Sequence, residues 1–361
     1  MKVLYVYKKK RSDAAWSNTI ETLGDMLSQR FGGLKKIQID NGSIGSLFAA
    51  FSEIYCESIQ HNDVIVIHHA ICFAVALCIA CGNGQKANAQ ILAAESKLKL
   101  ISDAFKFTEG PTADNNGNVL FTDQPNNQIL FYDFASDTVS DWLKPAGRSN
   151  GLFFTSQRLI ACADEKNELW EINPTTKQTK VLCDQYKTRT LAGPNDCWVD
   201  TDGAIYFTDP LYQRPYWKQV IADDHPRGVY RVNPQGEITQ VVDDLIQPNG
   251  IIGDARKRVI YIADINAGKT YRYRIKQDGT LIEKTLFCNS GSDGMTIDRE
   301  GNVYLTGKGV SVFNEEGKKI TSIPVPKRWT ANVTFSGPER KHLFITAGNS
   351  VYVIKTQMTG L

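Results

Sequence analysis

The chain has 361 residues, of which 41 are basic and 39 acidic, so its formal net charge is only +2. These interspersed charges provide no cationic face for nucleic acid and no basic patch for an anionic membrane surface. With 42% hydrophobic residues the chain can bury a full core. Its length predicts one large domain plus an additional segment, since repeat-built all-β folds hold many residues in one unit.

Residues 1–67 alternate three short apolar runs, KVLYVY, KKIQI and DVIVIH, with two amphipathic stretches. This βαβαβ pattern is typical of a short α/β segment. It faintly resembles the start of a nucleotide-sugar glycosyltransferase domain of the Rossmann-like kind. No GxGxxG or phosphate-binding loop follows any of its strands, so we assign it no activity.

Residues 68–92 form an apolar segment that ends at Cys81 and a polar linker. Three interpretations are open: a buried strand and helix, a membrane span of minimal length, or a signal sequence. Cys-Ile-Ala-Cys resembles a bacterial lipoprotein cleavage box, which predicts a lipid anchor at Cys81 and a periplasmic or cell-envelope location. The signal interpretation requires residues 1–67 to be a fusion or an upstream reading frame; without it we expect a cytoplasmic protein.

The eight cysteines show no zinc-site spacing. We expect buried structural thiols, with disulfides as the alternative if the protein is exported.

From about Glu109 onward one pattern recurs six times: a turn, a short apolar strand, then a small residue that is often followed by aspartate. The small residues are Thr122, Ala163, Thr208, Ala263, Thr306 and Thr346. Periods of about 40 to 50 residues with several short strands are typical of propeller blades. The sequence therefore predicts an all-β six-bladed β-propeller over residues 93–361. We expect a strand preceding Glu109 to complete the last blade and close the ring.

A second element precedes each repeat and marks the innermost strand of a blade. Each such strand begins at an oxygen-bearing side chain: Glu109, Asn150, Asn195, Asn249, Asp293 and Asn332. Innermost strands run along the central channel of a propeller, so these side chains are expected to converge. Any one of them alone is more often a turn former. Six equivalent positions favour a shared site for Ca²⁺ or another divalent cation, and none is the His or Cys that zinc prefers.

Several segments resemble the SMP-30/gluconolactonase/LRE-like family, in order and across residues 95–360. They are TEGPTAD at 108–114, GPNDCWVDTDGAIYFTDP at 193–210, PNGI at 248–251, SDGMTIDREGNVYLT at 292–306 and FSGPERKHLFIT at 335–346. The resemblance implies a calcium-dependent lactonase in which Glu109, Asn249 and Asp293 hold the metal. It also implies that Asn195 contacts the metal, its bound water or the substrate, and that Asn150 faces the same channel.

The resemblance further implies that a bound cation polarises a lactone carbonyl while a carboxylate takes a proton from the attacking water. Asp293 is the favoured base. Asp196 is the second candidate, or a partner that orients Asn195. Some sugar-lactonase members carry an arginine where this chain has Gly193, so Arg148 is the candidate for binding the sugar acid.

The third repeat is longer than its neighbours, and long loops on a propeller face often form lids. Either Tyr212, Tyr216 and Trp217 stack on a sugar ring, with Trp217 as a substrate-binding residue, or the loop packs on a neighbouring blade. His225 and His342 are expected at the surface, so no paraoxonase-type histidine pair is predicted.

The leading hypothesis is a hydrolase that opens a small sugar lactone. The alternative is a non-catalytic propeller that binds a carbohydrate or a protein. Lyase chemistry like that of strictosidine synthase is a third possibility, which does not require the metal-binding residues.

Overall fold

The computed structural model describes residues 3–8, 34–39, 91–218 and 220–361, and the chain divides into two compact units, Met1–Ala89 and Gln90–Leu361. In the first unit, β1 (Val3–Lys8) pairs in parallel with β2 (Leu34–Ile39). The rest of the expected βαβαβ pattern lies outside the described residues. So do Cys81 and nearly all of the apolar segment and linker.

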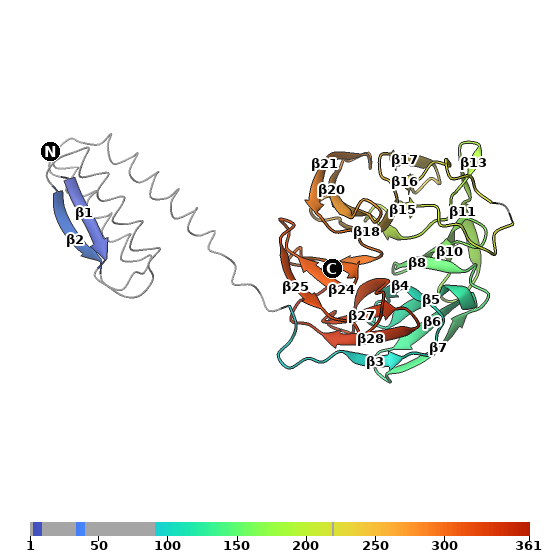
Figure 1. Cartoon of the computed structure of the whole chain (residues 1–361), viewed down its shortest axis with the longest axis horizontal. Helices are drawn as coiled ribbons and strands as arrows, with labels where there is room; N and C mark the ends of the chain where they lie inside the picture. Colours follow the sequence, from blue (N-terminus) through green and yellow to red (C-terminus); the bar gives the residue numbers. More distant parts are fainter. Residues whose placement is uncertain (1–2, 9–33, 40–90, 219) are drawn as a thin grey trace. The chain divides into compact units, whose positions relative to one another are not determined.

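The second unit forms six four-stranded antiparallel sheets within residues 91–361 as described, and they stand as blades around a common axis (Figure 1). Blade 1 contains β4 (Thr108–Ala113), β5 (Val119–Asp123), β6 (Gln128–Asp133) and β7 (Thr138–Leu143). Blade 2 contains β8 (Ser149–Phe154), β9 (Leu159–Ala163), β10 (Glu168–Ile172) and β11 (Thr179–Cys183). Blade 3 contains β14 (Cys197–Val199), β15 (Ile205–Asp209), β16 (Gly228–Val232) and β17 (Ile238–Val242).

The remaining blades follow in chain order. Blade 4 contains β18 (Pro248–Asp254), β19 (Val259–Asp264), β20 (Lys269–Ile275) and β21 (Leu281–Cys288). Blade 5 contains β22 (Met295–Ile297), β23 (Val303–Gly307), β24 (Gly309–Phe313) and β25 (Lys319–Ile323). Blade 6 contains β26 (Asn332–Ser336), β27 (His342–Ala347), β28 (Ser350–Lys355) and β3 (Lys99–Ser102). Short additional elements are the 3₁₀ turn η1 (Gln124–Asn126) and a hairpin of β12 (Gln185–Tyr186) and β13 (Arg189–Thr190).

Blade 6 joins the two ends of the propeller. Its outermost strand, β3, precedes the whole repeat array in sequence and pairs antiparallel with β28. The hydroxyl of Thr108, at the start of β4, also donates to the carbonyl of Ser350 at 2.9 Å. The predictions of an all-β six-bladed propeller and of ring closure by a preceding strand are confirmed.

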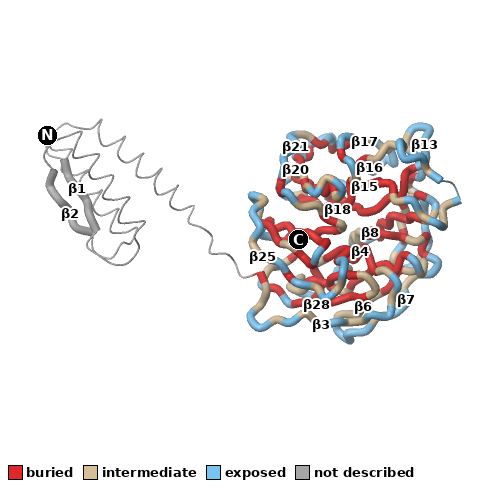
Figure 2. Tube along the Cα trace, viewed as in Figure 1, coloured by how far each residue is buried: buried red, intermediate tan, exposed pale blue. Residues whose placement is uncertain are grey.

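Burial falls from the channel outward (Figure 2). The second strand of blade 1, β5, is fully buried, whereas its outermost strand, β7, contains only exposed and half-buried residues. The cores lie between neighbouring blades: Trp198 and Tyr206 of blade 3 pack in one cluster with Ile260 and Ile262 of blade 4. A strand buried on both faces reads as a continuous apolar run, which explains sequences such as VIYIAD in β19.

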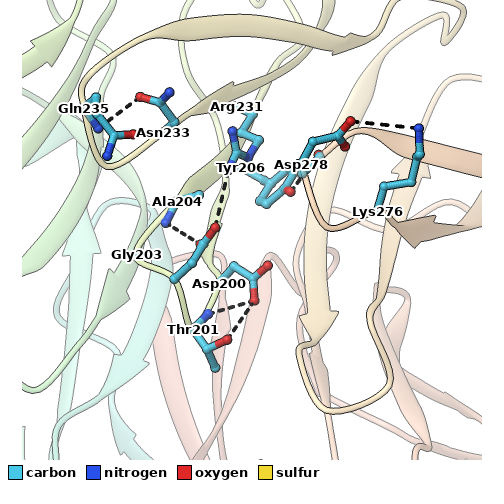
Figure 3. Close-up of polar contacts among 12 residues, drawn as sticks. Asp200, Thr201, Gly203, Ala204, Tyr206, Arg231, Asn233, Gln235, Lys276 and Asp278 are labelled. Atoms are coloured by element: carbon cyan, nitrogen blue, oxygen red, sulfur yellow. Dashed lines mark hydrogen bonds and ion pairs between the residues drawn. The ribbon is translucent and has the colours of Figure 1, made fainter.

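Blades 3 and 4 are also joined by polar contacts at the end of β14 that is distant from Asn195. Figure 3 shows Tyr206 and Asp200 in this junction. The Tyr206 hydroxyl donates to the carbonyl of Gly279 at 2.8 Å, and Arg258 Nη1 donates to Asp200 Oδ2 at 2.6 Å. Because Asp200 is buried, its ion pair with Arg258 offsets the cost of burying the carboxylate.

The four cysteines of the described propeller, Cys162, Cys183, Cys197 and Cys288, are buried free thiols. The other four lie outside the described residues. No helix in the described part of the chain is long and apolar enough to cross a bilayer.

Candidate functional site: the polar end of the channel

Six oxygen-bearing side chains stand at the same end of the six innermost strands, and we call them the channel ring. They are Glu109 on β4, Asn150 on β8, Asn195 before β14, Asn249 on β18, Asp293 before β22 and Asn332 on β26. Five of them are buried, and Asp293 is partly exposed. The ring thus brings together residues that are more than 200 positions apart in the sequence.

Glycines explain how the innermost strands approach so closely. A Cβ on Gly110 would lie 2.0 Å from the carbonyl oxygen of Asn150, and one on Gly250 would lie 2.6 Å from that of Asp293. A Cβ on Gly294 would lie 1.8 Å from Cγ of Asn332. Each glycine directly follows a ring residue and contacts the ring residue of the next blade. Any side chain at these positions would push the blades apart, because the space is already filled by heavy atoms.

Threonines of the adjacent strands hold the ring backbone in place. Thr306 Oγ1 lies 2.8 Å from the carbonyl oxygens of both Gly294 and Ala331, so its single proton serves one or the other and links blades 5 and 6. Thr122 Oγ1 donates to the carbonyl of Asn150 at 3.1 Å. The small residue that marks each repeat in the sequence therefore has a structural role where it is threonine: its hydroxyl satisfies buried carbonyls beside the channel.

Three carboxylates face one another at the ring. Burial raises the pKa of Glu109 well above its ordinary value, and the negative charges of Asp293 and Asp196 raise it further. Burial likewise raises the pKa of Asp196 to about 8 and that of Asp293 to about 6. Asp196 also accepts a hydrogen bond across the channel, from Asn332 Nδ2 at 3.5 Å. The raised pKa values mean that this buried place disfavours three negative charges together, and a bound cation would compensate those charges.

Asn249 shows the clearest sign that the ring fits a metal. Its Nδ2 donates to Asp293 Oδ1 and to the Tyr212 hydroxyl, both at 2.9 Å. Its Oδ1 is buried and has no hydrogen-bond partner among the described atoms. An unpaired buried carbonyl oxygen is costly, and a hard cation is a natural partner for it. In the described residues, no group of three or more His, Cys, Asp and Glu side chains is arranged to hold a metal. The candidate donor set combines carboxylates with amide oxygens.

Asp293 is held at both carboxylate oxygens. Oδ1 accepts from Asn249, and Oδ2 accepts from the indole Nε1 of Trp329 at 2.5 Å. Trp329 comes from the loop before β26, and no sequence pattern singled it out. The side chains of Asn150 and Asn195 form no hydrogen bond with another described residue.

The first part of the long loop in the third repeat, residues 211–218, forms a segment that we call the strap. Three strap side chains bind Asp164 at the end of β9. Arg214 Nε and the Tyr216 hydroxyl each donate to Asp164 Oδ2 at 2.7 Å, and Trp217 Nε1 donates to the Asp164 carbonyl at 2.6 Å. The Asp164 side chain is only 3% exposed, so one buried residue anchors the strap.

The strap explains why glycine stands at position 193. Gly193 has φ of +112°, and a Cβ there would lie 2.8 Å from both Trp217 Cζ2 and Asp164 Oδ1. An arginine at this position would displace the strap. Trp217 itself is bonded to the Asp164 carbonyl, and its role in substrate binding stays a prediction.

Arg148, the other sequence candidate, lies beside the strap. Its Nη1 donates to the Pro125 carbonyl at 2.8 Å, and its guanidinium stacks 4.5 Å from the centre of the Tyr216 ring. Of the residues that the structure describes, two are histidines, and neither forms a hydrogen bond with a ring residue. His342 packs against Phe134, and His225 lies in the loop before β16.

A family model described as the SMP-30/Gluconolactonase/LRE-like region matches residues 107–349. The gluconolactonase of Zymomonas mobilis is 28% identical over 302 residues, which cover 75% of this chain and 84% of that protein. The solved structure of a gluconolactonase from Xanthomonas campestris shares 25% sequence identity with a TM-score of 0.68, covering 74% of this chain and 94% of that one. Regucalcin from Agrobacterium tumefaciens, described as a calcium-binding protein, shares the fold at 18% identity and a TM-score of 0.62, covering 74% of this chain and 96% of that one.

Proposed function

The chain belongs to the SMP-30/gluconolactonase/LRE-like family, and on that premise we propose that its propeller hydrolyses a small sugar lactone with the help of a divalent cation, Ca²⁺, at the channel ring. Relatives that carry the names gluconolactonase and lactonohydrolase support an enzyme of this class. The observation that carries the metal site is the buried, unpartnered Oδ1 of Asn249 beside three carboxylates.

Glu109, Asn249, Asp293 and Asn195 are the residues that would hold the cation. A cation bound there would act as a Lewis acid on the lactone carbonyl and stabilise the negative charge that develops on its oxygen. The family neighbour described as a calcium-binding protein supports Ca²⁺ as the ion. The all-oxygen donor set supports the same choice, because Ca²⁺ prefers carboxylate and amide oxygens.

Asp293 is the best-placed general base for the attacking water. It is the ring carboxylate with partial exposure, whereas Glu109 and Asp196 are buried. Its orientation is fixed by the hydrogen bonds from Asn249 and Trp329, which leaves little freedom to lose on reaction. Asp196 accepts from its neighbouring backbone N–H of Cys197 at 2.9 Å and from Asn332, which suits a residue that shapes the channel wall.

The experiment is an assay of the purified full chain on a panel of lactones, with glucono-1,5-lactone first, corrected for the rate without protein. We expect turnover that falls on addition of a chelator and returns with Ca²⁺. No turnover on any lactone would contradict the proposal and favour a binding propeller. Turnover that is insensitive to chelator would contradict the catalytic role of the metal but not the hydrolase activity.

A further inference from the structure

We propose that the strap is the substrate-recognition element of this site, in which the Tyr212 hydroxyl and the Arg214 guanidinium bind hydroxyl oxygens of a polyhydroxylated lactone. Asp164 is the positioning residue that holds Arg214 in place. This inference rests on the proposed function and adds to it the residues that select the substrate.

Tyr212 connects the strap to the ring. Its hydroxyl oxygen accepts a hydrogen bond from Asn249 Nδ2 at 2.9 Å. The same nitrogen donates to Asp293, so Tyr212 and the candidate base are bonded to one side-chain amide. The phenol proton has no acceptor among the residues described. A hydroxyl group that accepts one hydrogen bond keeps its own proton to donate. Tyr212 therefore presents a donor at the place where a ligand on the ring would lie.

Arg214 presents further donors from the same strap. Its Nε is used in the bond to Asp164, whereas its two terminal nitrogens form no hydrogen bond with any described residue. The guanidinium lies 5.4 Å from the centre of the Tyr212 ring, and the Tyr212 hydroxyl is bonded to the ring residue Asn249. The planar fork of an arginine suits two neighbouring oxygen atoms on one ligand.

The positions of these donors are fixed before a ligand arrives. Asp164 is buried and binds Arg214, Tyr216 and Trp217 together, and Gln124 Nε2 also donates to its Oδ2 at 2.8 Å. Burial raises the pKa of the Asp164 carboxyl, and the charge of Arg214 opposes this rise. A strap with this many anchors loses little conformational entropy when a ligand binds.

The chemistry of the donors defines the ligand. A guanidinium contains only donor atoms, and the Tyr212 oxygen already accepts from Asn249. Both groups therefore bind acceptor oxygens of a ligand. The carbonyl of a lactone is the reacting group and belongs with the cation and the water. The ring oxygen belongs to the same reacting ester group, and the other acceptors of a sugar lactone are its hydroxyl groups, which an unsubstituted lactone lacks. The strap therefore predicts selectivity for hydroxylated over unsubstituted lactones.

The test compares kcat/KM on glucono-1,5-lactone and on δ-valerolactone for wild type, Arg214→Ala, Arg214→Lys and Tyr212→Phe. The matched control is Arg274→Ala, which removes an exposed arginine paired with Glu283 in blade 4. We expect Arg214→Ala to lower kcat/KM on gluconolactone about tenfold to hundredfold, mainly through KM, as for lost charged hydrogen bonds. Turnover of δ-valerolactone should change less than about twofold, and Arg214→Lys should recover part of the loss.

A binding measurement separates this inference from the proposed function. Calorimetry of D-gluconate with the calcium-loaded full chain reports recognition without turnover. Weaker binding by Arg214→Ala and Tyr212→Phe would support the strap even if the wild type hydrolysed no lactone. If the wild type is active, an unchanged ratio of kcat/KM on the two lactones in the variants would overturn the inference. Unchanged gluconate affinity in both variants would also overturn it. If Arg214→Ala unfolds, Arg214→Lys and Tyr212→Phe carry the comparison.

Discussion

Asn249 donates its side-chain amide to Asp293 at 2.9 Å across the boundary between blades 4 and 5, while its own Oδ1 is buried without a partner. The amide thus orients the carboxylate that we propose as the base. At the same time it turns a carbonyl oxygen toward the place where we propose the cation. One side chain couples the two halves of the site.

Replacing Asn249 with Ala should weaken metal binding, because it removes both the unpaired oxygen and the orientation of Asp293. In the wild type, excess Ca²⁺ should raise the melting temperature by stabilising the folded state alone. We expect this rise to shrink strongly in Asn249→Ala. The exposed Asn115→Ala is the control and should behave like the wild type. An equal calcium-induced rise in both variants would remove Asn249 from the site.

Trp329→Phe tests the hydrogen bond to Asp293 without disturbing the core, since Trp329 is 38% exposed. A hydrogen bond to a charged group is worth about 1.5–3 kcal/mol. We therefore expect kcat for the best lactone to fall about tenfold or more, with an unchanged melting temperature. Steady-state kinetics with thermal unfolding measures both. An unaltered kcat would show that the indole N–H does not orient the base.

Gly294→Ala tests the close approach of blades 5 and 6. The added methyl group would overlap Asn332, so we expect a loss of about 1–3 kcal/mol in the free energy of unfolding and a loss of calcium binding. In Gly236→Ala the methyl group meets nothing within 4 Å, and only the positive φ of +87° opposes it. That control should cost about 1 kcal/mol and keep calcium binding. Urea unfolding and a calcium titration distinguish the two variants.

The blades and the ring residues could be predicted from the sequence, whereas the role of these glycines could not. The repeat period predicted the six blades, and the polar head of each innermost strand predicted which side chains share the channel end, because both follow from local spacing. The role of Gly294 depends on the neighbouring blade, because a Cβ there would overlap Asn332, and it is visible only in three dimensions.

The contacts of Trp329, Tyr212 and Asp164 could not be predicted for a related reason. Each arises where a loop or strand end of one blade meets another blade, and no sequence period fixes where such a loop lies. A weak signal existed for Asp164, since aspartate often follows the small residue of each repeat. At the equivalent Asp264 the carboxylate binds the backbone N–H groups of Ile246 and Gln247, whereas Asp164 binds the strap.

The junction of blades 3 and 4 predicts a change in stability without a change in activity. Tyr206→Phe removes the buried hydrogen bond that the Tyr206 hydroxyl donates to the Gly279 carbonyl. We expect the free energy of unfolding to fall by about 1 kcal/mol, with kcat and KM unchanged. Tyr271→Phe on the outer part of blade 4 is the control. A large loss of activity in Tyr206→Phe would contradict the prediction and show that this junction affects the geometry of the channel ring.

Asp209 predicts a pH dependence of stability. Burial raises its pKa from 3.8 to about 7, and Asp164 adds to the rise. The folded state then binds this proton more tightly than the unfolded state does. The free energy of unfolding due to this group is therefore highest below pH 4 and decreases as pH rises to about 7. Asp209→Asn should reduce that decrease, so its stability relative to the wild type should be greater at pH 8 than at pH 4. A difference independent of pH would contradict the raised pKa.

The most direct measurement of the central claim is a calcium titration of lactone hydrolysis in chelator-treated protein, for the wild type and for Glu109→Gln. We expect the wild type to gain glucono-1,5-lactone turnover in proportion to the occupancy of one calcium per chain. We expect Glu109→Gln to need far more calcium for the same rate. Turnover in the wild type that shows no dependence on calcium, or identical titration curves for the two proteins, would contradict a catalytic cation at the channel ring.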